Sequence, residues 1–265
     1  MINYTERLTE LMYDVVSRVP QLGCIDLSRV LVFGRLGRSD AEGAYASCHC
    51  LTLPTSEPGY FFWKDRQTGE LTRRSEWFVT KSPEVEIGGN PINYLISFVL
   101  PRFSDQSLHR SRKREFYDDE PGWVAKLDTV VHELYHIDPQ GLGLRQAVLP
   151  DGNISSRLHG PTYYEDVARM VRQYLATNPD PRMYEFLQHD FEGLTGRYGK
   201  VVCTTFRNFP SFPQRYNERS QLQPEVGPAL KVEVLRPVSQ PRRYTERDLS
   251  MRMFTPQTSR AVALS

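Results

Sequence analysis

The chain of 265 residues has no apolar run long enough to cross a membrane. Stretches such as residues 94–100 fall far short of the roughly 20 apolar residues that a transmembrane helix needs. The first residues mix acidic and basic side chains, without the basic start and apolar run of a signal peptide. Cysteine is also scarce, with four in the chain, and Cys48 and Cys50 are spaced too tightly for a zinc-ribbon pair. We therefore expect reduced thiols, no membrane partner and a cytoplasmic location.

Net charge is nearly absent as well, because 33 basic residues face 32 acidic ones and leave a formal charge of +1. This balance excludes a protein that binds polyanions through its overall charge. The charge is unevenly spread, however: residues 207–265 hold ten basic and five acidic side chains, together with seven of the 19 prolines. The sequence predicts a domain over residues 1–206 and an extended, basic, Pro-rich arm over residues 207–265.

The first 206 residues alternate between helical and strand patterns. Apolar periodicity predicts helices over residues 5–19 and 123–137, a helix that opens at Thr162, and one that opens at Asp180 and ends at Gly193 and Gly196. Thr162 and Glu165 have the spacing of a capping box. Runs rich in β-branched and aromatic residues predict strands, at residues 29–33, 44–53, 60–63, 76–80, 92–100 and 200–206. In the arm, only residues 230–235 resemble a strand. The mixture predicts the α+β class.

The segment from His132 to His136 reads HELYH and carries the clearest chemical signal. A separation of four residues is about one helical turn, so His132 and His136 project from the same side of a helix and can hold one Zn²⁺ ion. Zinc lowers the pKa of a water molecule, and Glu133 is the candidate general base that takes its proton. The pattern predicts a zinc metallopeptidase with a protein or peptide as substrate.

A third protein ligand is needed, because a catalytic zinc site keeps its fourth position for water. Metzincins have a histidine six residues after the second one, but Leu142 stands at that position and excludes the class. His159 is the preferred third ligand, since imidazole suits zinc and Gly160 allows a close approach. The alternatives lie further along the chain: Asp166, Glu165 and His189.

Two tyrosines that follow His159 are candidates for stabilising the transition state. The hydroxyl of Tyr163 or Tyr164 is expected to donate a hydrogen bond to the oxyanion that forms when a peptide carbonyl is attacked.

The HELYHI string at residues 132–137, with Gly141, Arg145, His159-Gly160 and the segment 164–167, resembles the phage-type zinc metallopeptidases. These are small zincin domains of phages and mobile elements, and the resemblance covers roughly residues 25–176. It implies a zincin-like fold with a small mixed sheet, an active-site helix that carries HExxH, and backing helices. It also implies peptidase activity with Zn²⁺, while the Pro-rich arm is not part of the pattern.

Two other functions fit parts of the sequence. A DNA-associated protease similar to the SprT/Spartan group would use the basic segment 110–114 and the arm, although no CxxC…CxxC ribbon follows the domain. A structural or interaction protein would keep the zincin-like core as a scaffold and dock a protein partner, or an assembly, through residues 207–265. A nucleic-acid partner is the weaker of these expectations, because a charge run is usually a solvated surface.

Overall fold

The computed structural model describes most of the chain, and all structural statements below concern these parts of it. They are residues 1–39, 42–51, 62–64, 71–74, 78–81, 83–107, 112–117, 120–141, 143–148, 152, 159–207, 214–217 and 243–255. Within them, no helix is both long and apolar enough to cross a membrane.

A three-stranded mixed sheet lies at the centre of the molecule. Strand β9 (Tyr94–Pro101) is its middle strand, parallel to β2 (Val30–Gly37) on one side and antiparallel to β3 (Ala46–Cys50) on the other. Every residue of β9 is buried, which explains why its sequence reads as a continuous apolar run rather than an alternating one. The predicted strands at residues 29–33, 44–53 and 92–100 correspond to these three.

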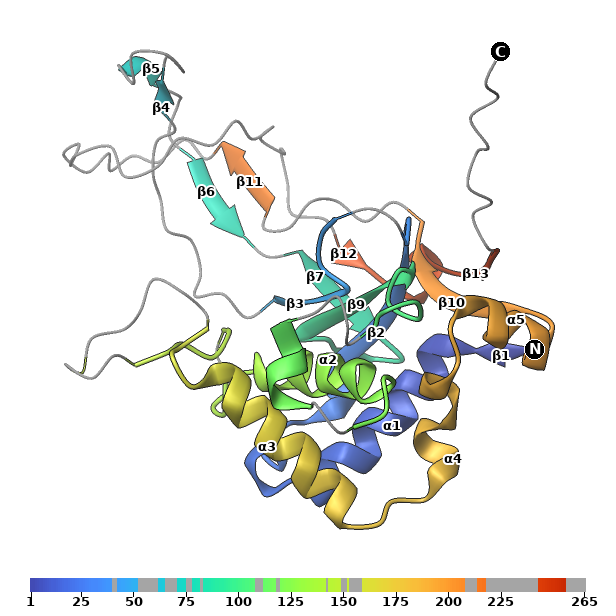
Figure 1. The fold of residues 1–265 in the computed structure, drawn as a ribbon. Helices are drawn as coiled ribbons and strands as arrows, with labels where there is room; N and C mark the ends of the chain where they lie inside the picture. Colours follow the sequence, from blue (N-terminus) through green and yellow to red (C-terminus); the bar gives the residue numbers. More distant parts are fainter. Residues whose placement is uncertain are drawn as a thin grey trace, which may run out of the picture.

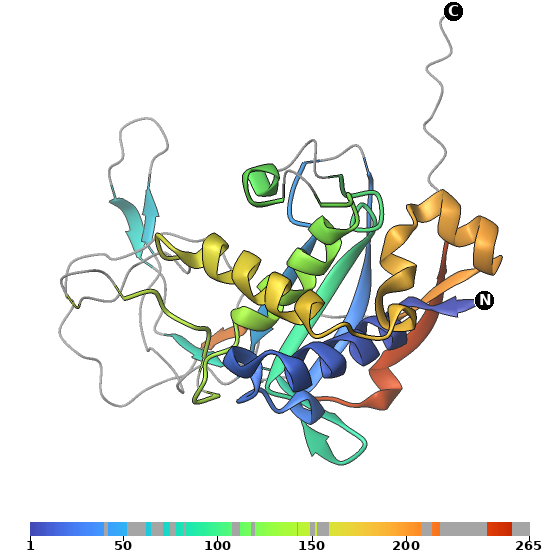
Figure 2. The same cartoon turned by 60° about the horizontal axis from the view of Figure 1, so that its bottom comes forward.

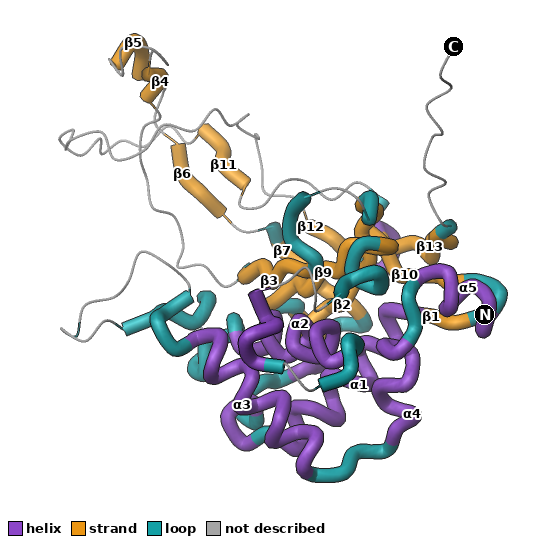
Figure 3. The backbone as a smooth tube through the Cα atoms, viewed as in Figure 1, coloured by secondary structure: helices purple, strands orange, loops and turns teal. Residues whose placement is uncertain are grey.

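Three helices lie on one face of this sheet, two of them against the strands and the third against the other two helices, as Figures 1 and 3 show. They are α1 (Tyr4–Arg18), α2 (Val124–Tyr135) and α3 (Tyr163–Ala176). Alternate side chains of the strands, such as Ile96 and Phe98 of β9, join the main hydrophobic core beneath them. The helices predicted at residues 5–19, 123–137 and after Thr162 are therefore confirmed, within about two residues at their ends.

The opposite face of the sheet has a smaller apolar cluster. Phe33 and Leu95 project to this side and meet Tyr244, which is fully buried. Tyr244 belongs to β12 (Arg243–Tyr244), which pairs with β7 (Glu84–Ile87), and β7 pairs in turn with β8 (Asn90–Pro91). Because both faces are covered, β9 lies in the interior of a layered structure.

A second sheet joins segments that are far apart in the sequence. Strand β10 (Val201–Phe206) lies between β1 (Ile2–Asn3) and β13 (Leu249–Phe254), and Figure 2 shows β13 in red on the same side of the molecule as the N-terminus. Phe254 is 3 % exposed and belongs to the main core. Residues 243–255 were predicted as part of an extended arm, and this prediction is wrong for them: the burial of Tyr244 and Phe254 attaches them to the body. The strand predicted at residues 230–235 lies outside the described residues.

The region after α3 differs from the predicted single helix. A short helix α4 (Pro181–Tyr184) is followed by a 3-10 turn (Glu185–Gln188) and then by α5 (Phe191–Tyr198). Asp190 begins α5 by accepting a hydrogen bond from the main-chain N–H of Gly193. The helix continues through the two glycines that were expected to end it and stops at Gly199, whose φ of 77° favours glycine.

The remaining elements are short. Two antiparallel pairs are formed by β4 (Phe62–Lys64) with β5 (Leu71–Arg74), and by β6 (Phe78–Lys81) with β11 (Gln214–Asn217). Further 3-10 turns lie at Pro20–Leu22, Leu27–Arg29, Arg112–Phe116 and Glu246–Asp248.

Candidate metal centre

Helix α2 is buried on nearly all sides, which fixes the direction of the side chains it carries. Its apolar residues Val124, Leu127, Val130, Val131 and Leu134 have no exposed surface. The helix begins at Trp123 without a side-chain cap, and the indole of Trp123 stacks instead on the ring of Tyr184, with centroids 4.8 Å apart. A helix held in this way presents its polar residues at defined positions in the core.

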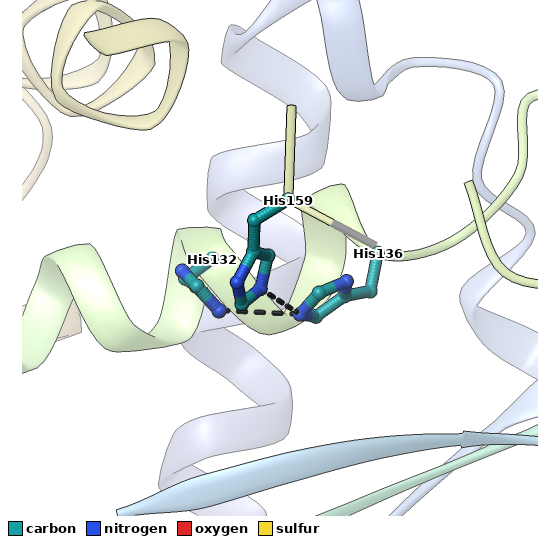
Figure 4. Close-up of side chains that lie close together, drawn as sticks. All are labelled: His132, His136 and His159. Atoms are coloured by element: carbon teal, nitrogen blue, oxygen red, sulfur yellow. Dashed lines mark hydrogen bonds between the residues drawn. The ribbon is translucent and has the colours of Figure 1, made fainter. Parts of the chain in front are cut away.

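Three histidines converge at the C-terminal end of this helix (Figure 4). His132 lies on α2 and His136 caps its C-terminal end one turn later, and His159 approaches them from the segment that precedes α3. The Nε2 atoms of His132 and His136 are 3.1 Å apart, and those of His136 and His159 are 3.2 Å apart. The potential ligand atoms of all three lie within 4.8 Å of one another.

This geometry fits a metal ion. A tetrahedral ion bound to imidazole nitrogens at about 2.0–2.1 Å requires those nitrogens to lie about 3.3 Å from one another. Three imidazoles are also a donor set that first-row metals accept, with one coordination position left open. The triad therefore has the chemistry and the spacing of a metal site.

The protonation state of the triad agrees with this fit. Burial lowers the pKa of His132 to about 2, and the neighbouring His136 adds to the effect. Burial also lowers the pKa of His136 to about 4 and shifts the pKa of His159 in the same direction. Neutral imidazole is the form that binds a metal ion, so the three side chains are ready to bind at neutral pH.

Two tyrosines at the start of α3 surround the triad. The hydroxyl of Tyr163 donates a hydrogen bond of 2.9 Å to the main-chain oxygen of His132, and its ring lies 4.6 Å from the ring of His159, centroid to centroid. The hydroxyl of Tyr164 lies 3.1 Å from Nδ1 of His159. Tyr163 is thus joined to the helix backbone, while Tyr164 orients the loop-borne histidine.

The structure groups His159, rather than the other candidate ligands, with the helix histidines. The carboxylate of Asp166 accepts a hydrogen bond of 3.1 Å from Thr162 and forms an ion pair with Arg169. Glu165 is exposed. His189 lies just before the start of α5, and its ring is near Arg197. The predicted capping box is also absent, because the side chain of Thr162 bonds Asp166 rather than the helix N-terminus.

Glu133 is 5 % exposed and faces β3 instead of the solvent. Burial raises the pKa of its carboxyl to about 8, although Lys113, the main-chain N–H of Cys48 and Arg35 each act in the opposite direction. The hydrogen bond from Cys48 fixes where the carboxyl lies. The side chain next to the triad can therefore hold or release a proton near neutral pH.

A second buried carboxylate, that of Asp128, lies on α2 one turn before His132. Asp128, 3 % exposed, pairs with Lys113 at 2.5 Å and accepts a hydrogen bond of 2.6 Å from Tyr117. Lys113 belongs to the basic segment 110–114 that suggested a nucleic-acid contact; its ammonium group is instead engaged inside the protein.

The chain matches no protein-family model, no curated protein and no solved structure. The inference of function therefore rests on the site itself.

Proposed function

We propose that this chain is a zinc-dependent metallopeptidase with a zincin-like fold. The observation that carries the proposal is the convergence of three neutral imidazoles beside a buried glutamate on one helix. His132, His136 and His159 would hold the ion, and a three-histidine set that leaves one position open is a known arrangement for catalytic zinc. Bound zinc would polarise the scissile carbonyl and lower the pKa of water.

Glu133 is the general base in this proposal. Glu133 is buried directly after the ligand His132, where the positive charge of a bound ion would favour the carboxylate form that accepts a proton. It takes a proton from the attacking water and returns it to the amine that leaves when the peptide bond breaks. The hydroxyl of Tyr164, next to His159, is the candidate donor to the oxyanion.

The outer edge of β3 is a feature that favours a peptide as the substrate. Leu51 donates to the main chain of Asn93, and Val99 donates to that of Tyr45, so the odd-numbered residues of β3 bond to β9. The main-chain groups of Cys48 consequently point to the outer edge, where no strand pairs with β3 in the described residues. Glu133 accepts the N–H of Cys48 at this edge. An extended peptide that adds to β3 would therefore lie beside the general base.

The test is metal analysis together with hydrolysis of an unstructured protein such as casein. The purified chain is expected to contain one zinc ion, and Glu133→Gln is expected to keep the ion while hydrolysis falls by about 10²–10⁴-fold. Glu165→Gln, an exposed glutamate of α3, is the matched control and should behave like the wild type. Unchanged hydrolysis in Glu133→Gln would overturn the proposal, and so would a chain that binds no metal.

The two other functions are outcomes of the same experiment. Hydrolysis that increases when DNA is added would identify a DNA-associated protease. Loss of metal with an intact biological role would identify an interaction protein, whose partner would bind through residues 207–265.

A further inference from the structure

A pocket of about 210 Å³ lies next to the histidine triad and has no part in the chemistry described so far. Its wall includes Tyr135, the neighbour of His136, and Gly160, the neighbour of His159. Tyr163, whose ring contacts all three histidines, forms another part of the wall. The pocket is thus built from the same segments that position the triad, so a group bound there lies beside the proposed reaction centre.

Arg145 supplies a cation to this pocket. Its Nε donates a hydrogen bond of 2.8 Å to the main-chain oxygen of Tyr135, and its guanidinium lies 4.2 Å from the centroid of that ring. The main-chain N–H of Arg145 also donates to the oxygen of His136, at 2.7 Å. These contacts hold the guanidinium in one place relative to the triad.

The guanidinium is fixed but not neutralised by the residues around it. Its Nη2 atom is buried and has no hydrogen-bond partner in the described part of the chain. Asp166, the acid in the pocket wall, is engaged with Thr162 and Arg169 instead. Arg145 forms no ion pair in the described part of the chain, so an anion that enters the pocket would supply the opposite charge that its guanidinium lacks.

We infer that this pocket is a substrate subsite for a carboxylate, an inference that rests on the proposed peptidase function. A carboxylate matches the planar fork of an arginine. A phosphate dianion fits less well, because the pocket offers one arginine and also contains Asp166. The volume of about 210 Å³ suits a single amino-acid residue. The carboxylate belongs either to the C-terminus of a peptide or to a glutamate or aspartate side chain.

The experiment measures binding rather than cleavage, so that it does not depend on catalysis. The full-length Glu133→Gln variant is titrated calorimetrically with two pairs of acetylated tetra-alanine-based peptides, with and without added zinc. The first pair has a free or an amidated C-terminus. The second pair is amidated and has glutamate or glutamine at the third position. Tighter binding of the free acid assigns the C-terminal carboxylate, and tighter binding of the glutamate peptide assigns the side chain. Equal binding within both pairs overturns the inference.

Variants of the pocket locate the binding. Arg145→Gln should reduce the preference for the carboxylate peptide by about tenfold or more, and Arg145→Lys should restore part of it. Arg182→Gln, an exposed arginine on α4 outside the pocket, is the matched control and should leave the preference unchanged. A preference that survives in a folded Arg145→Gln protein contradicts the assignment.

Gln146 gives an independent test if Arg145→Gln does not fold. Gln146 is exposed and lies in the pocket wall. Gln146→Glu should weaken and Gln146→Lys should strengthen binding of the carboxylate peptide, because the two variants add opposite charges at the same place. Identical affinities in both overturn the inference. A carboxylate preference in a chain that shows no hydrolysis would separate a failure of the proposed function from a failure of the pocket assignment.

Discussion

Two carboxylates on helix α2, five residues apart and equally buried, are treated very differently by their surroundings. Asp128 has an ammonium group at 2.5 Å and a tyrosine hydroxyl at 2.6 Å. Glu133 has one main-chain N–H, from Cys48, and burial dominates its pKa. The first half of α2 therefore uses its acid to hold neighbouring segments together. The second half keeps its acid able to take up or release a proton.

The Asp128 region ties the Arg112–Phe116 turn to α2 and, through this turn, connects α2 with α3. Lys113 also donates to the hydroxyl of Thr129 at 2.6 Å and to the main-chain oxygen of Ala125 at 3.2 Å. Arg172 of α3 donates to the main-chain oxygen of Phe116, at 2.7 Å. The Arg112–Phe116 turn is thereby held between α2 and α3. Substitutions around Asp128 are therefore expected to change the stability of the fold, whereas substitutions around Glu133 are expected to change the chemistry of the site.

The largest effect is expected from Asp128→Ala. It leaves the Lys113 ammonium buried without its carboxylate, so the free energy of unfolding should fall by about 3–5 kcal/mol, measured by urea denaturation. Glu10→Ala, which breaks an exposed ion pair with Arg7, should change it by less than about 1 kcal/mol. The double variant Lys113→Met with Asp128→Leu should recover much of the loss. A single variant as stable as the wild type would show that the pair is not structural.

Glu133→Gln should change the free energy of unfolding of the metal-free protein in the opposite direction to Asp128→Ala. The folded, metal-free protein binds the Glu133 proton with a pKa of about 8, whereas the unfolded chain binds it with the ordinary value near 4.5. The carboxyl therefore favours folding less and less as pH rises from about 4.5 to 8. Between pH 5 and pH 8 the wild type should lose about 3 kcal/mol more stability than Glu133→Gln. Parallel pH profiles of the two metal-free proteins would contradict the raised pKa.

Tyr117→Phe should have a smaller effect on the Asp128 side. It removes the hydrogen bond from the tyrosine hydroxyl and leaves one oxygen of a buried carboxylate less satisfied. We expect a loss of about 1.5–3 kcal/mol in the same urea measurement, without a change in metal content. Tyr13→Phe, on the exposed side of α1, is the control and should be close to neutral. An equal effect in both variants would argue against a structural role for the Asp128 group.

The smallest effect is expected on the Glu133 side, from Tyr164→Phe. The variant removes the hydroxyl that lies 3.1 Å from Nδ1 of His159, and zinc affinity should fall by about tenfold in a competition assay with a chelator. Tyr163→Phe should lower it less, because that hydroxyl bonds the main chain of His132 rather than an imidazole. The reverse order would mean that His159 is oriented mainly by packing.

The sequence predicted the helix-borne half of the centre because its information is local. The spacing of His132 and His136 and the apolar stripe of α2 follow from one helical period. His159 was preferred because imidazole suits zinc and Gly160 allows a close approach, and the three-dimensional arrangement then groups it with the other two. Lys113 could not be assigned, because its partner lies 15 positions away and the contact depends on how a turn packs on α2.

The incorrect predictions of the fold also concern contacts that a local sequence pattern does not reveal. Thr162 has the composition of a cap, but Asp166 competes successfully for its hydroxyl. The segment 249–254 is a strand because β10 offers it a pairing edge, and its own sequence shows little of this. Composition described the arm correctly as basic and Pro-rich, yet it could not show that part of it completes a sheet.

The sheet of β1, β10 and β13 also determines when, during translation, the body of the protein can be completed. Strand β10 pairs with residues 2–3 and with residues 249–254, so its ladder is complete only after residue 254 has left the ribosome. Until then the edge of β10 that later binds β13 carries unpaired main-chain groups, the kind of surface at which nascent chains associate. Helix α2 is made more than 100 residues earlier, and His159 precedes β13 by 90 residues. The residues of the candidate metal centre are therefore translated well before the last strand of the body.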